Sequence, residues 1–183
     1  MARILTVSGS PRVPSRSAKL LDHVAREAEL AGHEVDQLRL IDLPADALLR
    51  ARADDPAVND SVRRLAAADA VVLATPVYKA SYTGVLKAWL DLLPQFALAE
   101  KVVLPLATGG SLAHALILDY ALRPVLQSMA ARHVVQGYLV VDRHIESDTD
   151  GVTTISGEAL PGLTDVVEGF LQALVLVPRP ALI

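Results

Sequence analysis

The residues best suited to chemistry lie in a turn that follows the first apolar run of the chain, residues 4–7. The polar side chains of this turn are Ser10, Arg12, Ser15, Arg16 and Ser17. Apolar residues recur at helical spacing directly after it, so the turn opens a helix. Free N–H groups at a helix N-terminus carry partial positive charge, and hydroxyl and guanidinium groups can complete a site for an anion. The turn therefore predicts a phosphate-binding site that needs no metal ion.

The basic character of this turn is local. Residues 9–19 include Arg12, Arg16 and Lys19 and no carboxylate, whereas the whole chain has a net charge of −4 and a pI near 5.7. A general binder of nucleic acid or of anionic membranes needs a basic face, which an acidic chain does not offer. We therefore expect neither kind of partner.

The composition is typical of one globular domain of ordinary size. The chain has 183 residues, of which 52% are hydrophobic and 21% charged, so we expect a single domain over residues 1–183. We see no cationic region followed by a long apolar run, and we expect a cytoplasmic protein without a signal peptide or membrane span. Zero cysteines exclude disulfides and thiol redox chemistry, and the five histidines show no metal-ligand spacing. If the protein transfers electrons, an organic cofactor must carry them.

Strand-like and helix-like segments alternate along the chain. Strands are expected at residues 3–8, 34–40, 70–75, 101–107 and 134–141. Helices are expected up to Gly32, at residues 44–52, from Asp55 onward, and at residues 83–93, 112–129 and 162–177, with Pro178 and Pro180 ending the last. The apolar runs of the third and fourth strands do not alternate, as in strands covered on both faces. This order predicts an α/β fold, a doubly wound five-stranded parallel sheet with helices on both faces.

Residues 142–161 stand apart from this alternation. They are polar and turn-rich, with Asp148, Asp150, Gly151 and Gly157 among them. We expect a surface excursion there, with one short edge strand at residues 152–155.

Two further loops are expected at the same sheet edge as the first turn, because ligands of parallel sheets bind at the carboxyl ends of the strands. The loop after the third strand offers Pro76, Val77, Tyr78 and Lys79, and the loop after the fourth offers Thr108, Gly109, Gly110 and Ser111. The glycines would let the main chain approach a flat ligand closely. Each loop also has a simpler explanation when it is taken singly. The first fits a plain helix N-cap, the second fits tyrosines packed on the sheet edge, and the third fits a tight turn. Together, one loop for a phosphate and two bordering a planar ring suit flavin mononucleotide, FMN.

Two other kinds of site are excluded. A dinucleotide-binding Rossmann site would need G-x-G-x-x-G in the first loop and an acidic residue that caps the second strand at the ribose position, and both are missing. The run at Ser10 is not the G-x-S-x-G elbow of a hydrolase. His114 and Asp119 are five residues apart on one helix and point about 140° away from each other, so they cannot form a triad with Ser111.

With these loops in place, the chain resembles the NADPH-dependent FMN reductases of the flavodoxin-like superfamily, in particular the reductase partner of two-component alkanesulfonate monooxygenases. The motifs that carry the resemblance are residues 9–12, 14–17, 75–79, 81–84, 104–110 and 119–124. The resemblance covers roughly residues 3–141. It implies a flavodoxin-like fold, FMN and NADPH as cofactors, and reduced FMN that is handed to a separate FMNH2-dependent monooxygenase, which releases sulfite from alkanesulfonates.

The resemblance also implies a π-helical insertion at a tetramer interface, on the helix that carries Tyr120. The sequence supplies an independent reason for an irregular helix, because Pro124 has no N–H to donate to the carbonyl of Tyr120. A π-bulge and a plain proline kink both satisfy that constraint. The expected helices at 83–93 and 112–129 are apolar on more than one side, which predicts a homodimer or homotetramer.

On this interpretation FMN binds with its phosphate on the first turn and its ring between the other two loops, and NADPH passes hydride to N5 of the ring. The cofactors perform the chemistry, so no catalytic residue is assigned. Lys79 either orients a phosphate or the flavin edge, or is a solvated lysine. Two alternatives remain open: a quinone or azo-compound reductase that keeps FMN tightly bound, and a flavodoxin-like electron carrier.

Overall fold

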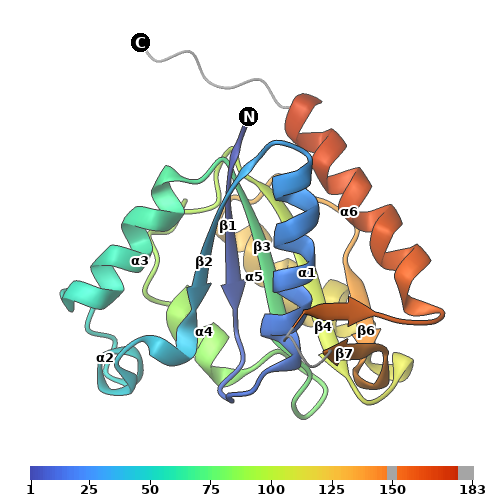
Figure 1. Ribbon diagram of the computed structural model, residues 1–183. Helices are drawn as coiled ribbons and strands as arrows, with labels where there is room; N and C mark the ends of the chain where they lie inside the picture. Colours follow the sequence, from blue (N-terminus) through green and yellow to red (C-terminus); the bar gives the residue numbers. More distant parts are fainter. Residues whose placement is uncertain (148–151, 177–183) are drawn as a thin grey trace.

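The computed structural model describes residues 1–147 and 152–176, in which a central sheet lies between two layers of helices (Figure 1). Its strands are β2 (Glu34–Arg39), β1 (Arg3–Ser8), β3 (Ala70–Pro76), β4 (Val102–Gly109), β5 (His133–Val134) and β6 (Tyr138–Val141). The order is β2-β1-β3-β4-β5, with β6 also paired to β4, and these pairings are parallel. This is the strand order of the flavodoxin-like doubly wound sheet, so the predicted fold class is confirmed.

The predicted fifth strand, residues 134–141, is divided in two, which corrects the expected five-stranded sheet to six strands. β5 pairs with Val102 and Val103 of β4, and β6 pairs from Leu106 onward. Pro105 lies at the interruption, and because it has no N–H it cannot donate to the ladder there. At Gly137 a Cβ would stand 2.6 Å from the Pro105 carbonyl oxygen, so the neighbouring chain crosses the gap in close contact.

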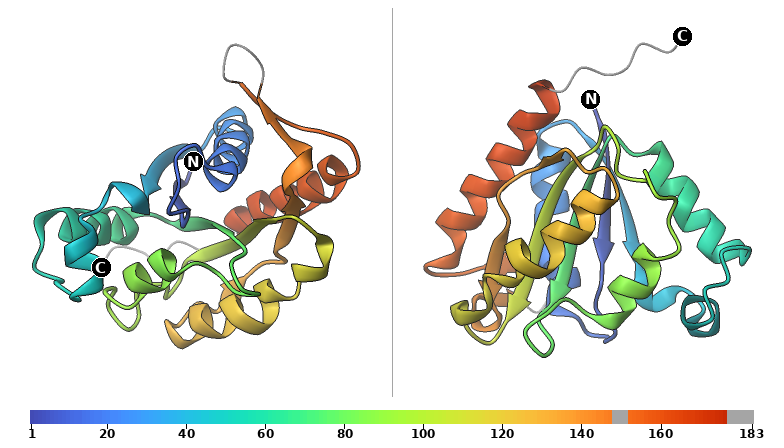
Figure 2. Two further views of the ribbon diagram at one scale, coloured as in Figure 1. Left: turned by 90° about the horizontal axis from the view of Figure 1, so that it is seen from below. Right: turned by 180° about the vertical axis from the view of Figure 1, so that it is seen from behind.

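Helices cover both faces of the sheet (Figure 2). One face carries α1 (Arg16–Leu30) and α6 (Ala159–Leu176), and the other carries α3 (Pro56–Ala67), α4 (Gly84–Leu90) and α5 (Arg123–Ser128). Two short elements, η1 (Leu40–Asp42) and α2 (Ala45–Leu49), follow β2. The helix predicted at 83–93 is shorter than expected. It ends at Leu90, and turns lead from there to Pro94. No helix in the described residues is long and apolar enough to cross a membrane.

Side chains that accept backbone hydrogen bonds set the starts of the helices. Ser15 Oγ accepts from Ala18 N at the start of α1, and Asp55 Oδ1 accepts from Ala57 N at the start of α3. Thr83 Oγ1 accepts from Leu86 N at the start of α4. Because these residues cap N–H groups that have no partner within the helix, the predicted helix starts at Asp55 and Thr83 are confirmed, whereas the last helix begins at Ala159 and not at residue 162.

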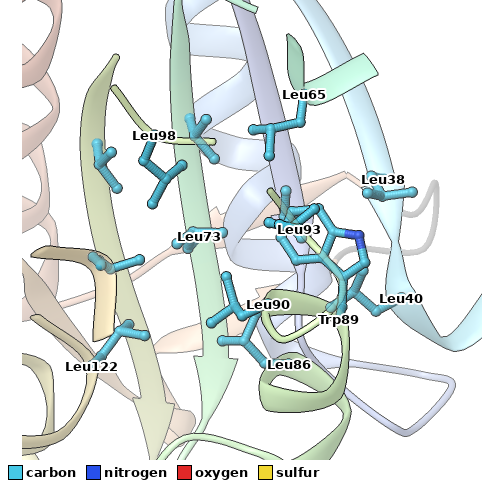
Figure 3. Packing of buried hydrophobic residues seen from close by; sticks show 14 of the residues in the cluster. Leu38, Leu40, Leu65, Leu73, Leu86, Trp89, Leu90, Leu93, Leu98 and Leu122 are labelled. Carbon is cyan, nitrogen blue, oxygen red and sulfur yellow. The ribbon is translucent and has the colours of Figure 1, made fainter. Parts of the chain in front are cut away.

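The core beneath α3, α4 and α5 centres on Trp89 (Figure 3). The indole is only 1% exposed, and its Nε1 donates to Ser61 Oγ of α3 at 3.0 Å. Leucines of β2, α3 and α4, among them Leu38, Leu65 and Leu86, surround it. α4 is thereby fixed to the sheet, and its first turn lies at the carboxyl edge of the strands.

The segment predicted as one long helix at 112–129 is irregular. It consists of η2 (Leu112–His114), η3 (Leu118–Leu122), which is a π-helix, and α5. Arg123 N–H donates to the carbonyl of Leu118, five residues back, and Pro124 follows at once without an N–H of its own. The structure therefore contains the π-helical turn, and not a plain proline kink.

The polar segment after β6 begins with η4 (Asp142–His144) and forms an antiparallel hairpin, β7 (Ile145–Ser147) with β8 (Thr153–Ile155). The predicted strand at 152–155 thus exists, but it pairs with β7 and not with the main sheet. Arg26 of α1 donates to the carbonyl of Thr153, which holds the hairpin against that helix. The turn residues Asp148, Asp150 and Gly151 and the helix stop at Pro178 and Pro180 lie outside the described residues.

Candidate functional site

The three predicted loops lie together at the carboxyl edge of the sheet, which is the lower edge in Figure 1. β1, β3 and β4 are adjacent and parallel, so the segments that follow them leave the sheet side by side. The structure therefore brings the predicted site residues of these loops to one edge. Their roles in binding remain predictions.

The first turn has the features of an anion site. Ser10 is buried and its Oγ accepts from Arg12 N at 3.2 Å, while the side chains of Arg12 and Arg16 are exposed. Ser15 caps Ala18 N, but the N–H groups of Arg16 and Ser17 have no acceptor within α1 by helix geometry. Two backbone donors thus lie at the N-terminus of a 15-residue helix that begins with Arg16, and the exposed Arg12 lies in the turn before it.

The second loop is a narrow turn. Tyr78 and Ser81 exchange backbone hydrogen bonds of 2.9 and 3.1 Å, and Lys79 and Ala80 between them have positive φ values of 51° and 58°. Non-glycine residues in this left-handed region carry a conformational cost, and such residues cluster at functional sites. Tyr78 is 41% exposed, so it lies at the rim of the site.

The third loop contacts the second and leaves room beside it. Val77 N donates to Thr108 O at 2.8 Å, and Val77 packs against Gly109. Gly110 is exposed, and no heavy atom lies within 4 Å of the place where a Cβ would stand. Open space beside the main chain is what a flat ring needs to approach closely. Ser111 Oγ is engaged as the cap of η2, where it accepts from Ala113 N.

Buried hydroxyl groups connect the three loops. Ser17 Oγ and Thr108 Oγ1 share a hydrogen bond of 2.9 Å, and both residues are 1% exposed. Ser17 can therefore offer its backbone N–H to a ligand, while its hydroxyl joins the first loop to the third. Thr83 Oγ1 donates to the carbonyl of Gly9 and so joins the first loop to the start of α4. The geometry of the three loops is thus set by interactions inside the protein.

One charged residue at this edge was missed by the sequence reasoning. Asp142 directly follows β6, whose last residue Val141 pairs with Gly109 of β4. Its Oδ2 lies 3.6 Å from Arg16 Nη1, so a carboxylate stands beside a predicted phosphate ligand. The signal was present in the sequence, since Asp142 is the first residue after the last predicted strand of the sheet. It was overlooked because the resemblance ended at residue 141.

The site is built from cations, hydroxyl groups and backbone amides, not from metal ligands. Among residues 1–147 and 152–176, no group of three or more His, Asp or Glu side chains is placed to hold a metal ion. The donor set of the first turn fits the phosphate of FMN, and the open space at Gly110 fits the edge of its ring.

Comparison with known proteins places these observations in a family context. The NADPH-dependent FMN reductase family matches residues 2–146 of the chain. An FMN reductase (NADPH) of Pseudomonas putida is 43% identical over 178 residues, which cover 97% of this chain and 90% of that protein. An FMN reductase (NADPH) of Escherichia coli is 46% identical over 143 residues, which cover 78% of this chain and 75% of that protein.

Among solved structures, the apo form of an NADH:FMN oxidoreductase superposes with a TM-score of 0.86 at 39% identity. The match covers 99% of this chain and 92% of that one. The likeness in fold therefore extends beyond residue 141, where the sequence motifs had ended.

Proposed function

The chain belongs to the NADPH-dependent FMN reductase family, and from that premise we propose that the three loops at the carboxyl edge of the sheet form the site where FMN is bound and reduced. The enzyme is an oxidoreductase that uses FMN and NADPH. The observation that carries the proposed site is the buried hydrogen bond between Ser17 and Thr108, because it joins the phosphate-type turn to the open loop at Gly110.

The residues of the chain bind and orient the cofactors. When FMN binds, its phosphate would be held by the backbone N–H groups of Arg16 and Ser17, the guanidinium groups of Arg12 and Arg16, and the hydroxyls of Ser10 and Ser15. Residues 76–79 and 108–111 would border the ring. Hydride chemistry is supplied by the two cofactors when bound, so the protein contributes position and charge.

We further propose that reduced FMN leaves this enzyme for a flavin-dependent monooxygenase that desulfonates alkanesulfonates. Two features support release over permanent retention. The rim of the site is exposed at Tyr78, Lys79, Gly110 and Ser111. The motif at residues 119–124 overlaps the π-helix, and the resemblance implies that such an insertion favours the release of reduced flavin.

The same segment supports a homo-oligomer. Leu112, Leu116 and Tyr120 are 61%, 64% and 79% exposed, although all three are large and apolar or aromatic. They lie within nine residues of chain on η2, η3 and the turn between them, so they form an exposed apolar strip. We propose that this strip packs against another copy of the chain, as dimer or tetramer.

The experiment that tests the proposed activity is the steady-state oxidation of NADPH and of NADH by purified protein, with and without added FMN. We expect rapid oxidation only when FMN is added, and a lower KM for FMN than for riboflavin, which lacks the phosphate. Replacing both Arg12 and Arg16 by Gln should raise the KM for FMN and leave that for riboflavin unchanged. Arg63→Gln, which removes a charge from the exposed side of α3, is the matched control.

Two results would contradict the proposal. Equal KM values for FMN and riboflavin would show that the site does not bind the phosphate of FMN. Retention of FMN through equilibrium dialysis, together with reduction of a quinone, would favour the reductase that holds its flavin tightly.

A further inference from the structure

Arg16 has two competing anionic partners at the proposed site. Its guanidinium Nη1 lies 3.6 Å from Asp142 Oδ2, and the proposed function assigns the same guanidinium to the phosphate of FMN. The distance is that of an ion pair without a short hydrogen bond, so little geometry has to be broken to separate the two groups. The side chains are 58% and 34% exposed, and the pair is therefore open to solvent and to an incoming anion.

Asp142 and Arg16 belong to different elements of the fold. It is the first residue after β6, and the register of β6 on β4 sets its neighbour Val141 opposite Gly109. Asp142 thus belongs to the end of the strand beside the third loop, while Arg16 belongs to the first turn of α1. The ion pair therefore links the end of β6 to the first turn of α1.

The contact with Asp142 brings a negative charge to the positively polarised N-terminus of α1. The first turn of α1 has no acidic residue, so its N–H groups without a helix partner and their partial positive charge are not neutralised from within the helix. Asp142 supplies a negative charge to that end from another element. A phosphate that arrives there must displace the carboxylate from Arg16, or bind close to it against like-charge repulsion.

We propose that Asp142 competes with the phosphate of FMN for Arg16 and so weakens flavin binding enough for the flavin to leave after reduction. This inference rests on the proposed function and gives the site a residue that tunes its affinity. Asp142 acts through Arg16, and it is a positioning residue, not a catalytic one.

The test is the dissociation constant of FMN and of riboflavin, measured by quenching of flavin fluorescence at low ionic strength. Four proteins are compared: the wild type, Asp142→Asn, Arg16→Gln and the double variant. Asp142→Asn should bind FMN about three- to tenfold more tightly, the range expected when one partly exposed like charge is removed. Its affinity for riboflavin should stay within about twofold of wild type, since riboflavin brings no phosphate charge.

The double variant shows whether the effect runs through Arg16. If it does, Asp142→Asn should no longer tighten FMN binding in the Arg16→Gln background. Glu34→Gln is the matched control, because Glu34 pairs with Arg3 at the opposite, amino-terminal edge of the sheet, with 3.2 Å between Nε and Oε2. It removes the same charge, and FMN affinity should not change.

The outcomes separate this inference from the proposed function. Unchanged or weaker FMN binding in Asp142→Asn would overturn competition, and weaker binding would mean that Asp142 holds Arg16 ready for the phosphate. Equal tightening of riboflavin, or tightening that persists without Arg16, would also overturn it. If the wild type binds no FMN, the proposed function fails and this inference fails with it.

Discussion

Replacing Thr83 by Val tests whether the loops at the carboxyl edge are held by the hydrogen bonds described above. Thr83 is 1% exposed and uses its hydroxyl twice. Its Oγ1 accepts from Leu86 N at 3.3 Å, which caps α4, and donates to the carbonyl of Gly9 in the first turn. Valine has nearly the same shape but can form neither bond, so the substitution isolates the hydroxyl.

The expected cost follows from these two bonds. Loss of a helix N-cap costs about 1 kcal/mol, with a range of about 0.5–2 kcal/mol. The carbonyl of Gly9, left without its hydroxyl donor, costs about a further 1–3 kcal/mol. The free energy of unfolding should therefore fall by about 2–4 kcal/mol. Thr83→Ser keeps the hydroxyl and loses one buried methyl group, which costs only about 1 kcal/mol.

The assay is urea unfolding followed by far-UV circular dichroism, with the midpoint and slope determined for both variants. The valine variant should be clearly less stable than the serine variant at an unchanged slope. If the two differ by less than about 0.5 kcal/mol, the hydroxyl does not hold the loops together and the reasoning is refuted.

Further outcomes are expected for four variants. Gly9→Ala should lower the free energy of unfolding by about 1–3 kcal/mol, because the new Cβ would stand 2.9 Å from a leucine Cβ of α4. Gly84→Ala, which has open space around it, should be neutral or stabilising in the same urea titration, and equal losses in both variants would contradict this. The hydrogen-bonded Arg64 guanidinium lowers the pKa of the Asp36 carboxyl below its ordinary value of 3.8, so this pair stabilises the fold above that pH and the contribution is lost as the pH falls below it. Asp36→Asn should therefore lose less stability than wild type between neutral pH and about pH 3, and parallel losses would refute the assignment. Leu116→Asp should lower the mass measured by sedimentation velocity, since it places a charge on the exposed apolar strip, and an unchanged mass would show that the strip is not an interface.

Much of the fold could be predicted because local signals agreed with the tertiary arrangement. Asp55 and Pro56 together mark a helix start, since the carboxylate caps the helix and proline suits its first turn. The divided fifth strand could not be read in the same way. Residues 134–141 are compatible with one strand by themselves, and the interruption comes from Pro105 on the neighbouring strand, a partner known only once the register is known.

Some features of the candidate site likewise could not be predicted from local sequence. Proline at position 124 predicted that the helix ladder must break near Tyr120, but proline chemistry alone allowed a kink or a π-turn, and the choice depends on how the helix packs. Ser17 was expected to face a ligand with its hydroxyl, whereas that hydroxyl is bonded to Thr108, 91 positions away. The position of Asp142 after the last predicted strand was visible in the sequence, but its contact with Arg16 follows only from the pairing of β6 with β4. These contacts join residues that are distant in sequence, so local sequence patterns do not predict them.

The most direct test of the central claim is a crystal structure of the protein soaked with FMN. We expect phosphate density at the N-terminus of α1, within hydrogen-bonding reach of Arg16 N and Ser17 N, and the flavin ring between residues 76–79 and 108–111. FMN bound elsewhere, with the turn after β1 empty, would contradict it.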